Sequence, residues 1–339
     1  MIVKASAPAK AILFGEHSVV YGEPAIAAAV NKRVYVNIRK SYTGETIFRA
    51  PDLGFEAELL TEHKKYILLK GKPGIIRYIL EALYRAHDHT PIEITMYSNV
   101  PIGSGLGSSA AVTVATLAAL YRYHNVYYDK KSLAHDAHMI EKAVQGVASP
   151  LDTYVSTYGG IIFFRRANKV EHFNINLNAP FVVGYTTKHG NTGKMVKEVR
   201  NLKVRNPKLI NNVISSMGYL TNQAKNAIYK RDFNKLGELM NINHGYLDVL
   251  GVNTLELSRM VYNARDAGAI GAKTTGSGGG GSIIALCPDK VDEVADTIEK
   301  EDNILKIRFT RKGVSSRVYK WFNDNFKDWR QYLNKQGFY

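Results

Sequence analysis

The 339-residue sequence is poor in several features, and each shortage excludes a class of protein. A single cysteine, Cys287, rules out an intramolecular disulfide and favours a reducing compartment, so we expect a cytoplasmic protein. No segment approaches the roughly 20 apolar residues that a membrane-spanning helix requires, and we expect no membrane partner. The first residues do not combine a basic region with a long apolar run, so we expect no signal peptide.

Acidic residues are also scarce: 30 Asp and Glu stand against 45 Lys and Arg, which gives a formal net charge of +15. A positive surface can steer nucleotides and other anions toward a cleft. It can also bind nucleic acid, which is one alternative function. The basic residues are spread along the chain, with denser stretches at 194–208 and 306–335. Because charged runs usually form solvated surfaces, we expect no nucleic-acid partner.

One glycine-rich stretch has the features of a phosphate-binding loop. It reads Pro101, Ile102, Gly103, Ser104, Gly105, Leu106, Gly107, Ser108, Ser109, Ala110 and Ala111. It follows an expected strand at 92–97 and opens an expected helix at 110–121. The alternate glycines let an anion lie against backbone N–H groups, and the two serines are expected to cap the helix. The stretch matches neither a Walker A loop nor the dinucleotide fingerprint.

Two further segments carry unusual combinations of residues. The mostly apolar segment 7–22 contains Lys10, Glu16 and His17, and apolar strands seldom carry three ionisable groups without a functional reason. The glycine-rich segment 273–282 is flanked by two strand-like runs. We therefore expect it to be a tight turn within a sheet and not a flexible linker.

Two acidic residues are candidates for chemistry at a phosphate site. Glu141 lies near the C-terminal end of a helix expected at 130–144, where the helix dipole disfavours a carboxylate and a metal ion would compensate. Asp152 follows Ser149-Pro150-Leu151, and on its own this pattern is typical of a turn. Read without context, Glu141 is better explained as a solvated helix carboxylate, and Asp152 as an ordinary turn residue.

These motifs resemble those of the GHMP kinases, the superfamily of galacto-, homoserine, mevalonate and phosphomevalonate kinases. The loop matches P-x-G-x-G-L-G-S-S-A at every fixed position. Segment 7–22 is similar to the mevalonate kinase pattern A-P-G-K-x-x-L-x-G-E-H-x-V-V-x-G, with Ala9 in place of a glycine. Segment 273–282 resembles K-x-T-G-A-G-G-G-G-C, with Ser277 and Ser282 as substitutions. Residues 148–153 look most like the archaeal type of mevalonate kinase.

The resemblance implies an enzyme that uses ATP and Mg²⁺ to phosphorylate (R)-mevalonate, and a homodimer. It implies that loop 101–111 binds ATP, that Ser109 and Glu141 hold Mg²⁺, and that Asp152 and Lys10 are catalytic. It further implies that the substrate contacts come from Glu16, His17, Thr192, Gly276 and Gly278. Another GHMP kinase, acting on homoserine, a sugar or phosphomevalonate, is the alternative within the superfamily.

The expected fold is α+β, with the two domains of a GHMP kinase. Residues 1–175 form the mixed α/β nucleotide-binding domain, and 176–313 form a ferredoxin-like domain with an antiparallel sheet. A polar piece at 41–45 is expected to be a hairpin turn. Aromatic and basic residues recur at near-helical spacing in the tail, 314–339, which we expect to be helical.

Overall fold

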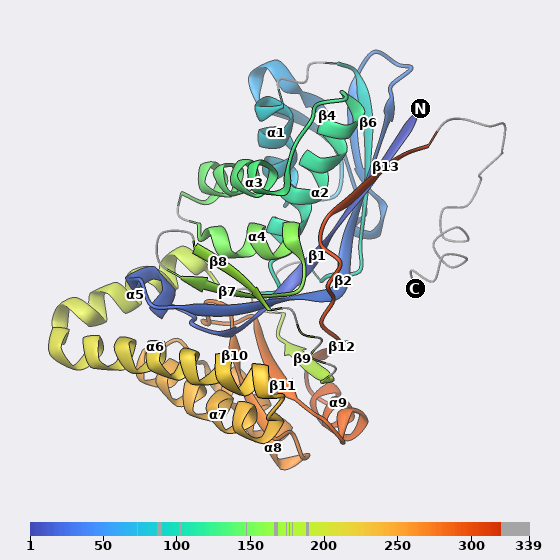
Figure 1. Ribbon diagram of the computed structural model, residues 1–339. Coiled ribbons are helices and arrows are strands. Elements are labelled where there is room, and N and C mark those ends of the chain that lie inside the picture. Colours follow the sequence, from blue (N-terminus) through green and yellow to red (C-terminus); the bar gives the residue numbers. More distant parts are fainter. Residues whose placement is uncertain are drawn as a thin grey trace.

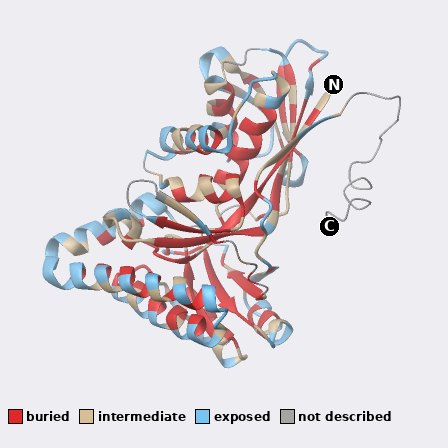
Figure 2. Ribbon diagram, in the orientation of Figure 1, coloured by how far each residue is buried: buried red, intermediate tan, exposed pale blue. Residues whose placement is uncertain are grey.

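The computed structural model describes residues 1–72, 74–86, 90–101, 104–146, 148–165, 169–173, 175, 177, 179–187 and 190–319. Within these ranges the chain builds two sheets, each covered by helices (Figure 1). Figure 2 shows that the strands of both sheets are largely buried. None of the described helices combines the length and the apolar character needed to cross a membrane.

The larger sheet has nine strands, and its main path runs β13-β1-β2-β6-β3-β4-β5, with β7 and β8 attached to β2. Its strands are β1 (Ile2–Phe14), β2 (Ala25–Lys40), β3 (Thr46–Ala50), β4 (Phe55–Leu60), β5 (Lys65–Lys70), β6 (Ile92–Ser98), β7 (Ile161–Arg165), β8 (Lys169–Phe173) and β13 (Ser315–Tyr319). The long antiparallel pair β1 and β2 forms its centre. The end of β1 therefore carries segment 7–22 from the middle of this sheet toward the second one (Figure 1).

Four helices pack beside this sheet: α1 (Ile76–Arg85), α2 (Ser108–Tyr123), α3 (Lys130–Gln145) and α4 (Pro150–Tyr158). Helix α2 is buried continuously from Ala110 to Leu120. A helix that is apolar all round must be covered on every side, and α2 is in contact with β1, β2 and the three other helices. This burial fixes the N-terminus of α2, where the glycine-rich loop ends.

The smaller sheet is antiparallel, with strand order β10-β11-β9-β12. Its strands are β9 (Phe181–Tyr185), β10 (Gly271–Thr275), β11 (Ser282–Leu286) and β12 (Asn303–Ile307). The accompanying helices are α5 (Thr192–Arg205), α6 (Pro207–Lys230), α7 (Phe233–Val249), α8 (Leu255–Asp266) and α9 (Val291–Glu299). Numbered from the first strand of this sheet in the chain, the strands lie side by side in the order 2-3-1-4. This is the strand order of a ferredoxin-like sheet, so the ferredoxin-like, α+β prediction is confirmed.

Two local predictions were wrong. Residues 41–45 do not form a hairpin turn, because β2 and β3 are not neighbours: β6 lies between them and pairs with β3 in parallel. The tail is not helical from residue 314, since Ser315–Tyr319 forms strand β13 against the first residues of β1. The buried Arg33 holds the approach to β13 by donating to the carbonyl oxygens of Lys312 and Gly313. Residues 320–339 lie outside the described part of the chain.

Candidate active site

A cleft of about 520 Å³ lies where the two sheets meet. Its walls come from the end of β1, the glycine-rich loop, the facing parts of α3 and α4, the start of α5 and the loop between β10 and β11. The lining includes Lys10, Glu16, His17, Gly105, Gly107, Ser108, Ser109, Glu141, Asp152, Thr192 and Gly276. Most of the residues that the sequence singled out are therefore brought to one place.

The glycine-rich loop supplies one wall of the cleft. Gly105, Gly107, Ser108 and Ser109 line it, whereas Leu106, Ala110 and Ala111 are fully buried in the core. Ser104 is buried and donates to the carbonyl oxygen of Pro101 over 2.8 Å. Ile102 and Gly103 lie outside the described residues. The loop therefore presents backbone and small side chains to the cleft.

The start of α2 differs from the prediction that serines cap it. The N-cap residue is Gly107, which has a left-handed conformation with φ of 66°, and no side chain caps the helix. The first N–H groups of a helix have no acceptors within the helix and carry the positive end of its dipole. Ser108 and Ser109 line the cleft, and a helix start in such a place is suited to binding an anion.

Lys10 and Asp152 meet within this cleft. The ammonium of Lys10 lies 3.2 Å from Oδ2 of Asp152, and it is 3.5 Å from the carbonyl oxygen of Gly105. Asp152 is not in a turn, as its sequence context suggested: it lies in the first turn of α4. Ser149 caps that helix and Pro150 occupies its first turn, a combination favoured at helix starts. A buried cation and a partly exposed carboxylate thus stand side by side.

Ser109 and Glu141 form the second pair. The hydroxyl of Ser109 donates to Oε1 of Glu141 over 2.7 Å, and Gln145 donates to the same oxygen over 3.3 Å. Burial, reinforced by the negative charge of Asp152, raises the pKa of Glu141 to about 8. A buried carboxylate at a cleft, next to a hydroxyl, fits a hard divalent cation that completes its shell with water and phosphate oxygens. These residues therefore suit Mg²⁺.

Another part of the cleft lining is formed by His17 and the loop after β10. Nε2 of His17 lies 2.9 Å from the carbonyl oxygen of Ser277, and the side-chain hydroxyl of Thr192 donates to that of Ser277 over 3.2 Å. Gly276 packs against the backbone of Gly105 and lines the cleft. Gly278 does not line it and instead packs against Val252, so its role is in the turn.

Glu16 differs most from expectation. Its side chain is fully buried, and its carboxylate accepts from the ammonium of Lys273 and, over 3.2 Å, from the side-chain amide of Asn243. Both carboxylate oxygens are therefore engaged inside the protein, although Glu16 is among the residues that line the cleft. Sequence reasoning missed Lys273 and Asn243. For Lys273 a signal existed, because the lysine stands among small, uncharged residues in a short expected strand, where a charge is as unusual as at Lys10.

The comparisons with known proteins agree with this geometry. Residues 74–160 match the GHMP kinases N terminal domain, and residues 224–303 match the GHMP kinases C terminal domain. The chain is therefore a member of the GHMP kinase family, a family of ATP-dependent kinases.

Within that family the similar proteins are mevalonate kinases. The mevalonate kinase of Methanothermobacter thermautotrophicus is 43% identical over 310 residues, which cover 91% of this chain and 98% of the relative. That of Pyrococcus abyssi is 42% identical, with 92% and 97% covered. The solved mevalonate kinase of Methanococcus jannaschii superposes with a TM-score of 0.78 at 28% identity, covering 91% of this chain and 98% of that one.

The contact between Gly107 and Lys10 gives a direct test of the site. A Cβ at residue 107 would lie 2.7 Å from Cε of Lys10, whereas one at residue 105 would meet nothing closer than 3.7 Å. Both glycines have positive φ, so both alanine variants carry similar backbone strain. We expect Gly107→Ala to lower kcat roughly 10- to 100-fold more than Gly105→Ala, because it displaces the ammonium. Equal kcat values, measured by ADP release, would contradict this role of Lys10.

Proposed function

We propose that this chain transfers the γ-phosphoryl group of ATP to the 5-hydroxyl of (R)-mevalonate, giving ADP and 5-phosphomevalonate. The observation that carries the proposal is the 3.2 Å contact between Lys10 and Asp152 beside the N-terminus of α2, which lines the cleft. An anion site, a cation and a carboxylate at one point are the parts that phosphoryl transfer requires. The identity of the acceptor is taken from the similar proteins. These are mevalonate kinases, and this chain matches them over nearly their full length.

The nucleotide end of the cleft is assigned to the glycine-rich loop. The backbone of 105–109 and the dipole of α2 hold the triphosphate. Ser109 and Glu141 would hold Mg²⁺, which neutralises charge on the β- and γ-phosphates when it is bound. Burial is the larger cause that raises the pKa of Glu141, and the like charge of Asp152 is the next largest. A phosphate-bound cation offsets the repulsion between the two carboxylates, so the residues are arranged for the complex with nucleotide.

The reacting centre is assigned to Asp152 and Lys10. Asp152 accepts a hydrogen bond from the acceptor hydroxyl and orients its oxygen toward the γ-phosphorus. Phosphoryl transfer passes through a loose transition state, in which the nucleophile needs little early deprotonation. Positioning therefore contributes most of the effect, and the proton passes to Asp152 late. Lys10 fixes the orientation of Asp152 and stabilises charge on the transferring oxygens.

The acceptor end is assigned to His17, Thr192 and Gly276, which line the same cleft as Asp152. Burial is the main cause that lowers the pKa of His17, so the ring is held neutral near pH 7. A neutral imidazole hydrogen-bonds to a carboxylate or hydroxyl without adding a charge to the site. We assign Glu16 no direct contact with the acceptor, since its carboxylate faces Lys273 and Asn243.

A panel of alcohols tests the acceptor. We expect ADP release with (R)-mevalonate, and at least roughly 100-fold lower kcat/KM with homoserine, galactose or phosphomevalonate, because discrimination by hydrogen-bonding groups reaches this size. Turnover of another alcohol in place of mevalonate would establish the alternative within the superfamily. The same preparation, titrated with polynucleotide at several salt concentrations, tests the nucleic-acid alternative, which requires binding without a phosphorylated product.

The role of Asp152 is tested by Asp152→Asn. The amide keeps the shape but loses the charge and the proton acceptor, so we expect kcat to fall by about 10²–10⁴. The KM for ATP should change by less than about twofold, because the triphosphate contacts lie elsewhere. Asp266→Asn, at the end of α8 and outside the cleft, is the control and should leave both constants unchanged. Near-normal turnover of the Asp152→Asn variant would refute the assignment.

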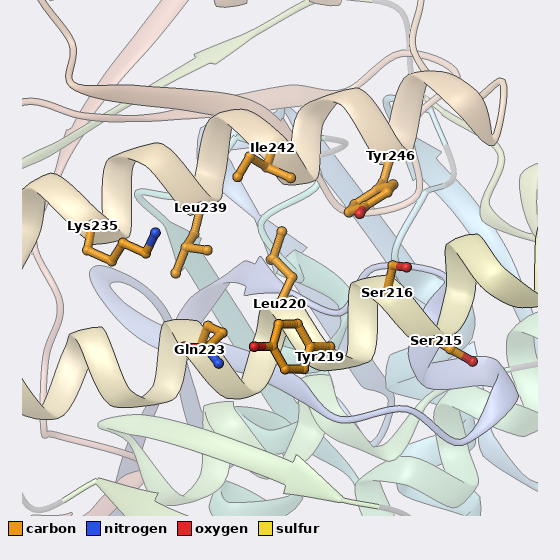
Figure 3. Close-up of a pocket in the computed structure, with 9 residues that line it drawn as sticks. All are labelled: Ser215, Ser216, Tyr219, Leu220, Gln223, Lys235, Leu239, Ile242 and Tyr246. Atoms are coloured by element: carbon orange, nitrogen blue, oxygen red, sulfur yellow. The ribbon is translucent and has the colours of Figure 1, made fainter.

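A homodimer belongs to the same proposal, on the strength of the family resemblance. The outer face of α6 and α7 offers a surface for it: a hollow of about 580 Å³ whose lining combines apolar and polar side chains and includes the exposed Tyr219 and Ile242 (Figure 3). Among the residues that line this hollow, Lys235 alone has an ionisable side chain of the Lys, Arg, His, Asp or Glu type. The hollow therefore does not resemble a second catalytic site. Sedimentation should give the mass of two chains, and Tyr219→Glu should reduce it to one; a wild-type monomer would contradict the dimer.

We also place the reaction in the cytoplasm. The support is the thiol of Cys287, which is buried and free, and whose pKa is raised by burial to about 12. A thiol held in this protonated state is suited to a reducing compartment.

A further inference from the structure

Glu16 and Lys273 form an ion pair of an unusual kind. Among the ion pairs of the described residues, it alone has both side chains at 0% exposure. The other pairs leave at least one partner partly in solvent, as Lys10 does with Asp152. An ion pair buried to this degree is often no more stable than apolar side chains of the same volume. Its presence beside a cleft therefore calls for an explanation other than stability.

The pair joins the two halves of the molecule. Glu16 follows β1 of the large sheet, whereas Lys273 lies within β10 of the small sheet. Asn243, on α7, donates to the second carboxylate oxygen of Glu16, and the ammonium of Lys273 also donates to the carbonyl oxygen of Thr274. The carboxylate is thus held at both oxygens by groups of the C-terminal half.

The same two segments are joined twice more. Thr275, two residues after Lys273, donates to the carbonyl oxygen of Ile12 over 2.9 Å. His17, next to Glu16, contacts the carbonyl oxygen of Ser277 over 2.9 Å. The three links fix the end of β1 against the strand and loop at 273–277, and the last of them involves a residue that lines the cleft.

The backbone at His17 needs such support. His17 has a positive φ of 59°, which is uncommon for a residue other than glycine. No side chain caps the short helix Ser18–Tyr21 that follows it. The conformation persists only if neighbouring contacts impose it. The strongest neighbouring contact is the charged one at Glu16.

We propose that Lys273 is a positioning residue for the acceptor: through the carboxylate of Glu16, it fixes the backbone and ring of His17 at the acceptor end of the cleft. Lys273 does not touch the reacting groups, because its side chain is fully buried and does not line the cleft. The nucleotide end is built mainly from the glycine-rich loop and α3. Segment 273–282 packs against that loop at Gly105 and Ser104, but the ammonium of Lys273 bonds to Glu16 and Thr274 instead. Loss of Lys273 therefore affects the acceptor and leaves the nucleotide site intact. This inference rests on the proposed function for the identity of the acceptor.

The test compares Lys273→Met, Glu16→Gln and the double variant Glu16→Gln/Lys273→Met. Each single variant leaves one buried charge without its partner and will lower the melting temperature. The double variant removes both charges, so its melting temperature should recover toward that of the wild type. Lys306→Met removes one partner of an exposed ion pair on β12 and is the matched control, with unchanged stability and kinetics.

For the double variant we expect the KM for mevalonate to rise at least about tenfold while the KM for ATP stays within about twofold. A recovered melting temperature together with a normal mevalonate KM would show that Lys273 only stabilises the fold, and would overturn the proposal. An equal rise in both KM values would also overturn it, since it would indicate general damage to the cleft.

The wild-type enzyme separates this inference from the proposed function. If it turns over a different alcohol, the proposed acceptor is wrong, and the same KM ratios are then measured with that alcohol. If it turns over mevalonate and the variants behave as the wild type, only the role of Lys273 fails.

Discussion

The arrangement of the cleft depends on one buried ammonium group, that of Lys10. Its side chain passes over Gly107, where a Cβ would collide with it, and reaches both Asp152 and the carbonyl oxygen of Gly105. The backbone N–H of Lys10 donates to the carbonyl oxygen of Leu106 over 2.9 Å, so strand and loop are also joined at the main chain. A charge that has lost most of its water must be matched by oxygen atoms at short range. This requirement brings β1, the glycine-rich loop and α4 together.

The sequence was most informative where the chemistry depends on the backbone. Glycines 105 and 107 and the apolar helix after them predict an anion site, because both the lack of Cβ and the helix dipole follow from residue type alone. The predicted side-chain capping by Ser108 and Ser109 was wrong. Gly107 adopts the left-handed conformation at the N-cap, and this frees the hydroxyl of Ser109 for Glu141. Residue types specify which groups are present, and tertiary contacts decide which bonds they make.

The errors at 41–45 and 315–319 share a physical cause, which is that sequence spacing does not determine non-local partners. Residues 41–45 join two strands that never pair, because β6 enters between them from a later part of the chain. Residues 315–319 pair with the first strand of the molecule, which lies at the other end of the sequence. The start of α4 was a different kind of error, since the cap Ser149 and Pro150 are local signals for a helix and were present in the sequence.

Lys10 and Lys273 show why similar signals in a sequence lead to different roles. Each is a buried lysine within a strand, and each is paired with one carboxylate. Asp152 keeps about a quarter of its side chain exposed, at 27%, so a ligand can reach the pair and the charge can act on it. Glu16 is at 0%, and the charge of Lys273 is used entirely within the protein. The pair nearer to solvent is suited to chemistry, whereas the enclosed pair can act only by fixing its neighbours. Exposure of the carboxylate, and not the presence of the lysine, therefore separates a group that takes part in the reaction from one that holds the cleft in shape.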